Sequence, residues 1–247
     1  MSGAEKKLSV NVGLLLAAGG SSRMGSPKQL LSWRDGTFFE HSLRCLWEGG
    51  ADEVVAVLGA HREAVLSHLP WLVNFIGGAS GAERSENSDL PEWLAGSTGG
   101  TKRLTAVVNE GWAEGMASSL RVGLRAALKS CEDSDRTLGA VAVCPVDLPF
   151  LSREAVKRII EALNECTAPE KAIIVPEYGE RRGHPVIFGS AYFEELLSLE
   201  GDRGGSPLLR AHKDRVIPVR ISDSGIFEDC DSQEQYKRIC GSGSMKE

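Results

Sequence analysis

The stretch Leu14-Leu15-Leu16-Ala17-Ala18-Gly19-Gly20-Ser21-Ser22-Arg23-Met24-Gly25-Ser26-Pro27-Lys28 organises the rest of the chain. Its apolar start predicts a buried strand at residues 12–17, after which the side chains become small. The three glycines of the following loop (residues 18–27, called the glycine loop below) allow tight turns and a close approach to a ligand. Bare N–H groups in such a loop form an anion-binding concavity, to which Arg23 and Lys28 add positive charge. The stretch therefore predicts a loop that holds a polyphosphate.

Two familiar glycine-rich motifs do not explain this loop. A P-loop ends in Gly-Lys-Ser or Gly-Lys-Thr, whereas Gly25 is followed by Ser26-Pro27-Lys28. A dinucleotide fingerprint leads directly into a helix, and Pro27 argues against a helix running through the loop. An ordinary strand-to-loop turn is the alternative, but two cations and three glycines exceed what such a turn requires.

Length and composition predict one globular α/β domain. The chain has 247 residues, of which 42% are hydrophobic and 25% charged, so it can bury a sizeable core. A net charge of −6 argues against nucleic acid and membrane surfaces as partners. No apolar run approaches the roughly 18 residues of a membrane span. Phosphate groups on a ligand must therefore be met by local cations.

The cysteines and the start of the chain bear on the compartment. Six scattered cysteines include no C-x-x-C pair, which argues against a zinc or redox site and favours reduced thiols. The first eleven residues contain Lys6 and Lys7 but no apolar h-region, so no secretory signal is predicted. We therefore expect a cytoplasmic protein.

Strand-like and helix-like segments alternate along the chain, which predicts a mostly parallel sheet with helices on both faces. We expect a single domain over residues 12–240, with a flexible N-terminus (1–11), an inserted loop at about 77–104 and a flexible tail (241–247). The expected strands are 12–17, 53–58, 72–76, 105–109, 139–144, 171–176, 185–188 and 215–221. The expected helices are 38–47, 60–69, 111–129, 152–163, 190–199, 207–212 and 232–239.

Asp147 is a candidate metal ligand. It follows an apolar strand and stands between Pro145 and Pro149, which stiffen the turn. A fixed carboxylate at a strand end suits Mg²⁺, which takes hard oxygen ligands and keeps several waters. Because ligands of parallel sheets bind beyond the carboxyl ends of the strands, Asp147 and the glycine loop should share one crevice. A helix-capping or turn aspartate is the alternative.

The pattern Leu-Ala-Ala-Gly-x-Ser-x-Arg-Met-Gly-x-x-Lys resembles the signature of the MobA-like nucleotidyltransferases. It is most similar to the branch that transfers CMP to molybdopterin, the molybdenum cofactor cytidylyltransferases. The resemblance implies a three-layer α/β/α Rossmann-like fold, CTP and molybdopterin as substrates, and Mg²⁺. It implies catalytic roles for Arg23, Lys28 and Asp147. The implied nucleotide-binding residues are Leu16, Ala17, Ala18, Gly19, Gly20, Ser21, Ser22, Arg23, Met24, Gly25, Lys28 and Ser118.

Two further motifs resemble acceptor-binding segments of that family. Gly115-Met116-Ala117-Ser118-Ser119-Leu120 matches the family's Gly-Met-x-x-Ser-Leu, and small residues at a helix start suit polar ligand edges. The Gly-His-Pro motif after Arg182 implies a wall of the molybdopterin pocket. The implied acceptor-binding residues are Gly115, Ser119, Arg182 and His184. The alternatives are an ordinary capped helix start for the first motif and a solvated charge pair for the arginines.

Two motifs near the C-terminus match the family less well. Asp229-Cys230-Asp231 resembles the family's Asp-Ile-Asp, so Asp229 and Asp231 join Asp147 as candidate metal ligands. The alternative is that Asp231 or Ser232 caps the last helix. Ser206 stands where the family has an arginine, whose task Arg203 or Arg210 could take over.

These observations predict a nucleotidyltransferase in which the phosphate of molybdopterin attacks the α-phosphate of CTP and pyrophosphate leaves. A molybdenum hydroxylase would receive the product. The methyl group of Ala18 is expected to narrow the base pocket and to favour cytosine over guanine. A nucleotidyltransferase acting on a sugar phosphate or another small molecule, and a non-catalytic molybdopterin carrier, are the alternatives.

Overall fold

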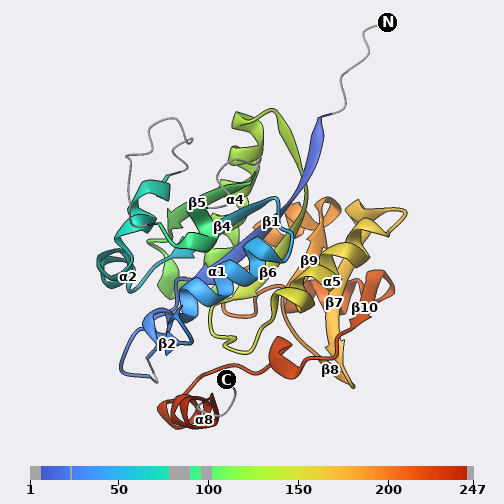
Figure 1. The fold of residues 1–247 in the computed structure, drawn as a ribbon. Helices are drawn as coiled ribbons and strands as arrows, with labels where there is room; N and C mark the ends of the chain where they lie inside the picture. Colours follow the sequence, from blue (N-terminus) through green and yellow to red (C-terminus); the bar gives the residue numbers. More distant parts are fainter. Residues whose placement is uncertain (1–6, 23, 78–89, 96–101, 244–247) are drawn as a thin grey trace, which may run out of the picture.

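The structure is a computed structural model that describes residues 7–22, 24–77, 90–95 and 102–243. One eight-stranded sheet runs through the molecule in the order β10-β7-β9-β6-β1-β4-β5, with β8 paired to β7 (Figure 1). The pairs β1–β4, β1–β6, β4–β5 and β7–β10 are parallel, whereas β9 runs antiparallel to both of its neighbours. The predicted mostly parallel sheet is therefore confirmed.

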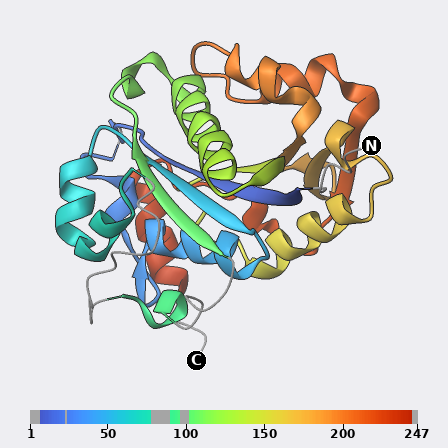
Figure 2. The same ribbon diagram turned by 90° about the horizontal axis from the view of Figure 1, so that it is seen from above.

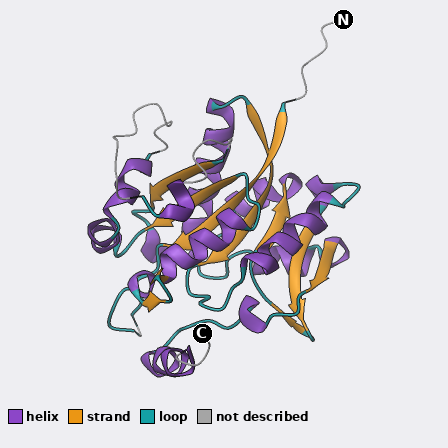
Figure 3. Cartoon of the chain, in the orientation of Figure 1, coloured by secondary structure: helices purple, strands orange, loops and turns teal. Residues whose placement is uncertain are grey.

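Apolar runs form the strands and amphipathic segments form the helices. Figure 3 colours the helices purple and the strands orange. The sheet strands are β1 Leu8–Ala17, β4 Glu53–Leu58, β5 Arg103–Val108, β6 Arg136–Pro145, β7 Ile173–Tyr178, β8 Arg181–Arg182, β9 Val186–Gly189 and β10 Val216–Arg220. A small hairpin pairs β2 Ser32–Trp33 with β3 Gly36–Thr37. The α-helices are α1 Phe38–Glu48, α2 Arg62–His68, α3 Glu92–Ala95, α4 Met116–Asp133, α5 Arg153–Asn164, α6 Phe193–Leu197, α7 Ser206–Ala211 and α8 Gln233–Gly243.

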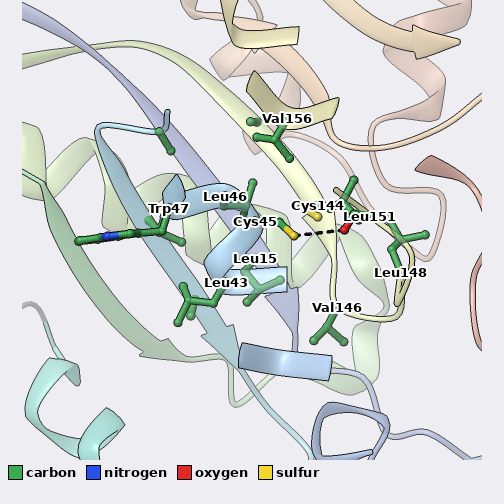
Figure 4. Close-up of a cluster of buried hydrophobic side chains, with 14 of the residues drawn as sticks. Leu15, Leu43, Cys45, Leu46, Trp47, Cys144, Val146, Leu148, Leu151 and Val156 are labelled. Atoms are coloured by element: carbon green, nitrogen blue, oxygen red, sulfur yellow. Dashed lines mark hydrogen bonds between the residues drawn. The ribbon is translucent and has the colours of Figure 1, made fainter. Parts of the chain in front are cut away.

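The sheet lies between two layers of helices, as the view along the sheet shows (Figure 2). Helix α4 covers one face, and α1 and α5 cover the other. Figure 4 shows part of the core beneath α1 and α5, where Leu15 and Leu46 pack near Cys144 and Val156. Both helices begin at side-chain caps: Thr37 and Glu40 form a capping box for α1, and Ser152 accepts a hydrogen bond at the start of α5.

Several boundaries differ from the sequence-based expectation. Strand β1 begins at Leu8 rather than at residue 12, because residues 8–10 pair with the first residues of β6. The short strand expected at 72–76 is wrong: Pro70–Phe75 forms a 3₁₀ helix, and only Ile76 makes an isolated bridge to β5. Helix α8 continues to Gly243, into the tail expected to be flexible.

The loop expected at 77–104 lies mainly outside the described residues. Of that range, the structure describes Gly77, residues 90–95 with α3, and residues 102–104 at the start of β5. In the described part of the chain, no helix has both the length and the apolar composition needed to cross a bilayer.

Candidate active site

A cavity of about 720 Å³ opens beyond the carboxyl ends of β1 and β6, where parallel sheets bind their ligands. Its volume falls within the roughly 300–1,000 Å³ usual for small-molecule sites. The glycine loop, the turn after β6, the start of α4 and a loop before α7 form its walls. The lining residues are Leu16, Ala18, Gly19, Gly20, Ser21, Ser22, Lys28, Gln29, Trp112, Ala113, Glu114, Gly115, Met116, Ser119, Pro145, Val146, Asp147, Gly201 and Asp202.

A larger cavity of about 870 Å³ lies between the β2–β3 hairpin, α1 and the start of α5. Its two helix-borne arginines are already paired: Arg44 with Glu48, and Arg153 with Glu48 and Glu154. It contains none of the residues of the glycine loop. We therefore place the candidate active site in the smaller cavity.

Lys28 is the centre of charge in this site. Its Nζ atom lies 3.1 Å from Oδ2 of Asp147 and also pairs with Asp231. The lysine side chain is only 13% exposed. Burial opposes its charge, but the attraction and hydrogen bonds of the two carboxylates outweigh burial, so the pKa of Lys28 is raised above 10.5. The ammonium is therefore charged at any pH near neutrality.

The segment after β10 completes the site from the far end of the sequence. The carbonyl of Asp147 accepts a hydrogen bond from the N–H of Cys230, which fixes the turn after β6 against this segment. Ser232 caps α8 by accepting from the N–H of Gln235, whose own side chain accepts from the N–H groups of Asp231 and Ser232. Ser232 therefore caps this helix, while the carboxylate of Asp231 faces Lys28.

The expected metal ligands form a partial donor set. Burial raises the pKa of the Asp229 carboxyl, and the negative charges of Asp231 and Asp147 raise it further. Within the described ranges, no three His, Cys, Asp or Glu side chains come together closely enough to hold a metal by themselves. Asp147 and Asp231 nevertheless converge on one cation, Lys28. Two carboxylates suit Mg²⁺, which is usually held by one or two of them together with waters and substrate phosphates.

The first three amides of α4 are already paired within the protein. The N–H of Met116 donates to Oδ1 of Asp202, that of Ala117 to the carbonyl of Gly201, and that of Ser118 to the carbonyl of Gly115. Gly115 has a φ of +107°, and a Cβ there would lie 2.6 Å from the Gly201 carbonyl oxygen. Gly115 is thus needed for this close approach, and it lines the cavity.

Ser118 and Ser119 are both held by one asparagine. The amide nitrogen of Asn109 donates to Oγ of Ser118 at 2.8 Å and to Oγ of Ser119 at 3.0 Å. Ser119 lines the cavity, as expected. Ser118 is buried behind it and donates to the backbone carbonyls of Gly111 and Gly115, so it is not one of the residues that line the cavity.

Arg182 and His184 are not among the described residues that line the cavity. The Arg182 side chain is exposed on β8, with Nε 3.9 Å from Glu177. His184 is partly buried beside the turn after β6. Burial lowers the pKa of His184, while a hydrogen bond to the backbone of Val143 and the negative charge of Asp147 oppose this shift. Its Nδ1 atom is buried without a hydrogen-bond partner. The acceptor-binding role expected of these two side chains therefore has no support from the geometry.

Neither arginine proposed to replace the one missing at Ser206 reaches the cavity lining. Arg210 instead folds back on Ser206, with Nη2 3.1 Å from its Oγ. Arg203 is exposed in the loop before α7. Arg23, expected to act in catalysis, lies outside the described residues.

Ala18 does not project its methyl group freely into the base pocket. It is 3% exposed and belongs to the core under α4. A Cβ on Gly59 would lie 2.7 Å from the Ala18 methyl, which shows that this methyl faces the end of β4. Ala18 therefore lines the cavity, while its methyl group packs against Gly59 at the end of β4.

Two residues of the cavity wall had no role in the sequence-based prediction. Gln29 is 1% exposed and donates hydrogen bonds to the carbonyls of Ala17, at the end of β1, and of Gly19, in the glycine loop. Trp112 is 39% exposed, and its ring lies against Gly20, where a Cβ would be 3.1 Å from Cζ3 of the indole. Such an exposed indole beside the glycine loop offers a platform on which a planar ring can stack, and neither its exposure nor its contact with Gly20 is visible in the sequence.

The sequence model described as the MobA-like NTP transferase domain matches residues 13–216, which include the glycine loop and Asp147. The chain belongs to this family. As a MobA-like NTP transferase it is a nucleotidyltransferase, and the family predicted from the glycine loop is confirmed.

Relatives and solved structures agree with membership of the MobA-like family. The nicotine blue oxidoreductase of Paenarthrobacter nicotinovorans is 30% identical over 92% of this chain and 95% of its own. The purine catabolism protein PucB of Bacillus subtilis is 25% identical over the same shares. A crystal structure of Rv0371c from Mycobacterium tuberculosis is 25% identical, with a TM-score of 0.65 over 94% of this chain and 98% of that one. A second structure of Rv0371c, at 23% identity and a TM-score of 0.63 over the same shares, is a complex with manganese.

Proposed function

We propose that this chain transfers CMP from CTP to the phosphate of molybdopterin and releases pyrophosphate. The observation that carries the proposal is the meeting of Lys28, at the end of the glycine loop, with Asp147 and Asp231 beside one cavity. Transfer of a nucleotidyl group requires positive charge at the phosphates, which Lys28 and a metal ion on the two carboxylates would supply. The choice of CTP and molybdopterin rests on the resemblance of the glycine loop to the cytidylyltransferase branch.

In the proposed reaction the protein positions two anions and supplies little covalent chemistry. The glycine loop surrounds the triphosphate, and Lys28 moves from the carboxylates toward the transferred phosphate, where it stabilises the charge that develops on the leaving oxygen. Arg23 is proposed to add a second cation. The phosphate of the acceptor enters from the side of Gly115 and Ser119 and attacks in line.

Asp147 and Asp231 are the residues that would hold Mg²⁺, with Asp229 beside them. The bound cation would neutralise charge on the phosphates. Their carboxylates now share Lys28, so they are directed at one point and need little rearrangement to share a cation. The structure of Rv0371c in complex with manganese supports the use of a divalent cation in the family. We further propose that the enzyme works in the cytoplasm and passes its product to a molybdenum hydroxylase.

One assay tests the proposal: pyrophosphate release from each of the four ribonucleoside triphosphates with molybdopterin, with and without Mg²⁺. We expect release from CTP that requires both molybdopterin and the metal. Release with a sugar 1-phosphate but not with molybdopterin would favour a sugar-phosphate nucleotidyltransferase. Binding of molybdopterin without any release would favour a carrier. Turnover of nicotine blue without pyrophosphate release would favour the activity for which the Paenarthrobacter relative is named.

A further inference from the structure

Gln29 ties the beginning of the glycine loop to its end. It lies in the 3₁₀ turn Lys28–Leu30 that follows the loop, and it is 1% exposed. Its Nε2 atom donates to the carbonyl of Ala17 at 2.7 Å and to the carbonyl of Gly19 at 3.1 Å. One side-chain amide therefore bonds to two carbonyls that lie 12 and 10 residues before it in the sequence, and so joins the two ends of the loop.

The carbonyl of Ala17 belongs to the last residue of β1. On the β6 side, the pairing of β1 ends at Leu16 with Pro145, and on the β4 side it ends at Ala17 with Leu58. The carbonyl of the next residue, Ala18, accepts from the N–H of Ala60. A buried carbonyl at the end of a strand needs a donor, and Gln29 supplies one for Ala17.

The second bond fixes a peptide inside the glycine loop. The Gly19–Gly20 peptide is trans, so its N–H points opposite to its carbonyl. With the carbonyl held on Gln29, the N–H of Gly20 is directed away from Gln29. The carbonyl of Gly20 in turn is 3.0 Å from Nε2 of His61. Two consecutive peptides of a glycine pair, the most mobile backbone available, are thus held by side chains.

The orientation of the Gln29 amide follows from its surroundings. Both groups that it meets are carbonyl oxygens, so the nitrogen must face them, and its Oε1 atom is left buried without a partner. A buried unpaired acceptor is costly, which indicates that the two bonds to the loop outweigh this cost. A side chain selected only to fill space would not carry this unpaired oxygen.

We propose that Gln29 is a positioning residue for the nucleotide: its amide holds the glycine loop in the shape that receives the triphosphate. The inference rests on the proposed function only in requiring that a nucleoside triphosphate binds in this cavity, whichever base it carries. Without the amide, the two carbonyls turn toward other donors, and the receptive loop becomes one conformer among several. Affinity then falls in proportion to the population of that conformer.

The test compares Gln29→Met and Gln29→Glu with wild type and with Thr105→Val. Methionine keeps the size and removes the donor, whereas glutamate keeps the shape and places an oxygen against two carbonyl oxygens. Thr105 is a matched control because its buried hydroxyl contacts Glu53 at the opposite end of the sheet, 3.5 Å away. Calorimetry first identifies the triphosphate that wild type binds most tightly with Mg²⁺ and without acceptor. The dissociation constant of that nucleotide and the melting temperature are then measured for each variant.

We expect Gln29→Met to weaken nucleotide binding at least about tenfold, since two backbone acceptors lose their donor. Gln29→Glu should be weaker still, and Thr105→Val should change affinity less than about twofold. The KM for the acceptor should stay near the wild-type value. If Gln29→Glu fails to fold, the methionine variant decides the question alone.

The proposal is overturned if Gln29→Met binds the nucleotide within twofold of wild type. It is also overturned if Thr105→Val loses as much affinity for an equal drop in melting temperature, because the effect would then reflect general stability. Wild-type protein that binds no triphosphate would instead refute the proposed function, and with it any role of Gln29 in nucleotide binding.

Discussion

Replacement of Lys28 by alanine is the sharpest perturbation of the proposed chemistry. The substitution removes an ammonium that lies 3.1 Å from Asp147 and also pairs with Asp231, so the positive charge shared by the two carboxylates is lost. Loss of one preorganised donor to a developing negative charge costs about 10²–10³ in kcat. Because the two carboxylate side chains are 22% and 31% exposed, solvent partly screens this site. We therefore expect a loss in kcat at the lower end of this range, about 100-fold, which corresponds to about 2.7 kcal/mol of transition-state stabilisation.

The assay is steady-state pyrophosphate release with CTP and molybdopterin. Lys28→Arg keeps the charge and should retain more activity than Lys28→Ala. Lys129→Ala is the matched control, because Lys129 forms an exposed pair with Asp133 on α4, away from the cavity. The raised pKa of Lys28 adds a pH criterion: the ammonium should persist to higher pH than that of a free lysine, so no loss of activity below about pH 9 should come from this residue.

A Lys28→Ala enzyme within a few-fold of wild type would refute the reasoning, provided that its melting temperature is unchanged. So would an equal loss in Lys28→Ala and Lys129→Ala. A loss confined to KM, with kcat unchanged, would show that Lys28 binds the ground state and the transition state equally.

Three further outcomes are expected. Trp112→Ala should weaken nucleotide binding about tenfold by calorimetry, since stacking of one base contributes roughly 1–3 kcal/mol, while the KM of the acceptor stays unchanged. Burial raises the pKa of Glu53 above 4.5 against the opposing charges of Arg103 and Arg136, so the folded state holds this proton more tightly than the unfolded chain. Stability should therefore fall as pH rises from about 4.5 through the folded pKa, and urea unfolding of Glu53→Gln should show a flatter pH profile. Ala18→Gly should raise kcat/KM for GTP relative to CTP by loosening the loop at Gly59; an unchanged ratio would contradict a role of Ala18 in base choice.

The sequence was sufficient for the features that depend on local patterns. Apolar runs located the strands, such as β4 at Glu53–Leu58, and Ser152 was recognised as the cap of α5. The site residues Lys28 and Asp147 were recognisable because charge follows an apolar strand at both places. Their meeting follows from the rule that parallel strands present their carboxyl ends at one edge of the sheet.

The remaining features depend on contacts between distant segments. The extension of β1 to Leu8 requires pairing with β6, more than 100 residues away in the sequence. The amides at the start of α4 looked free because Asp202, which occupies one of them, is 86 residues further along the chain. The acceptors of Gln29 are backbone carbonyls 12 and 10 residues before it, and no sequence pattern marks such bonds, so the role of Gln29 could not be predicted.

The contact between the glycine loop and the segment around α8 has a consequence for the order in which the protein is made. Gln233 donates to the carbonyl of Met24 across 209 residues, and Asp231 reaches Lys28 across 203. The described strands all precede Asp231 in the sequence, so the last partner of Lys28 is also the last to be synthesised. A chain that stops before Cys230 would lack both of these contacts and would leave the buried cluster of Met24, Trp33 and Phe38 without Cys230 and Ile239.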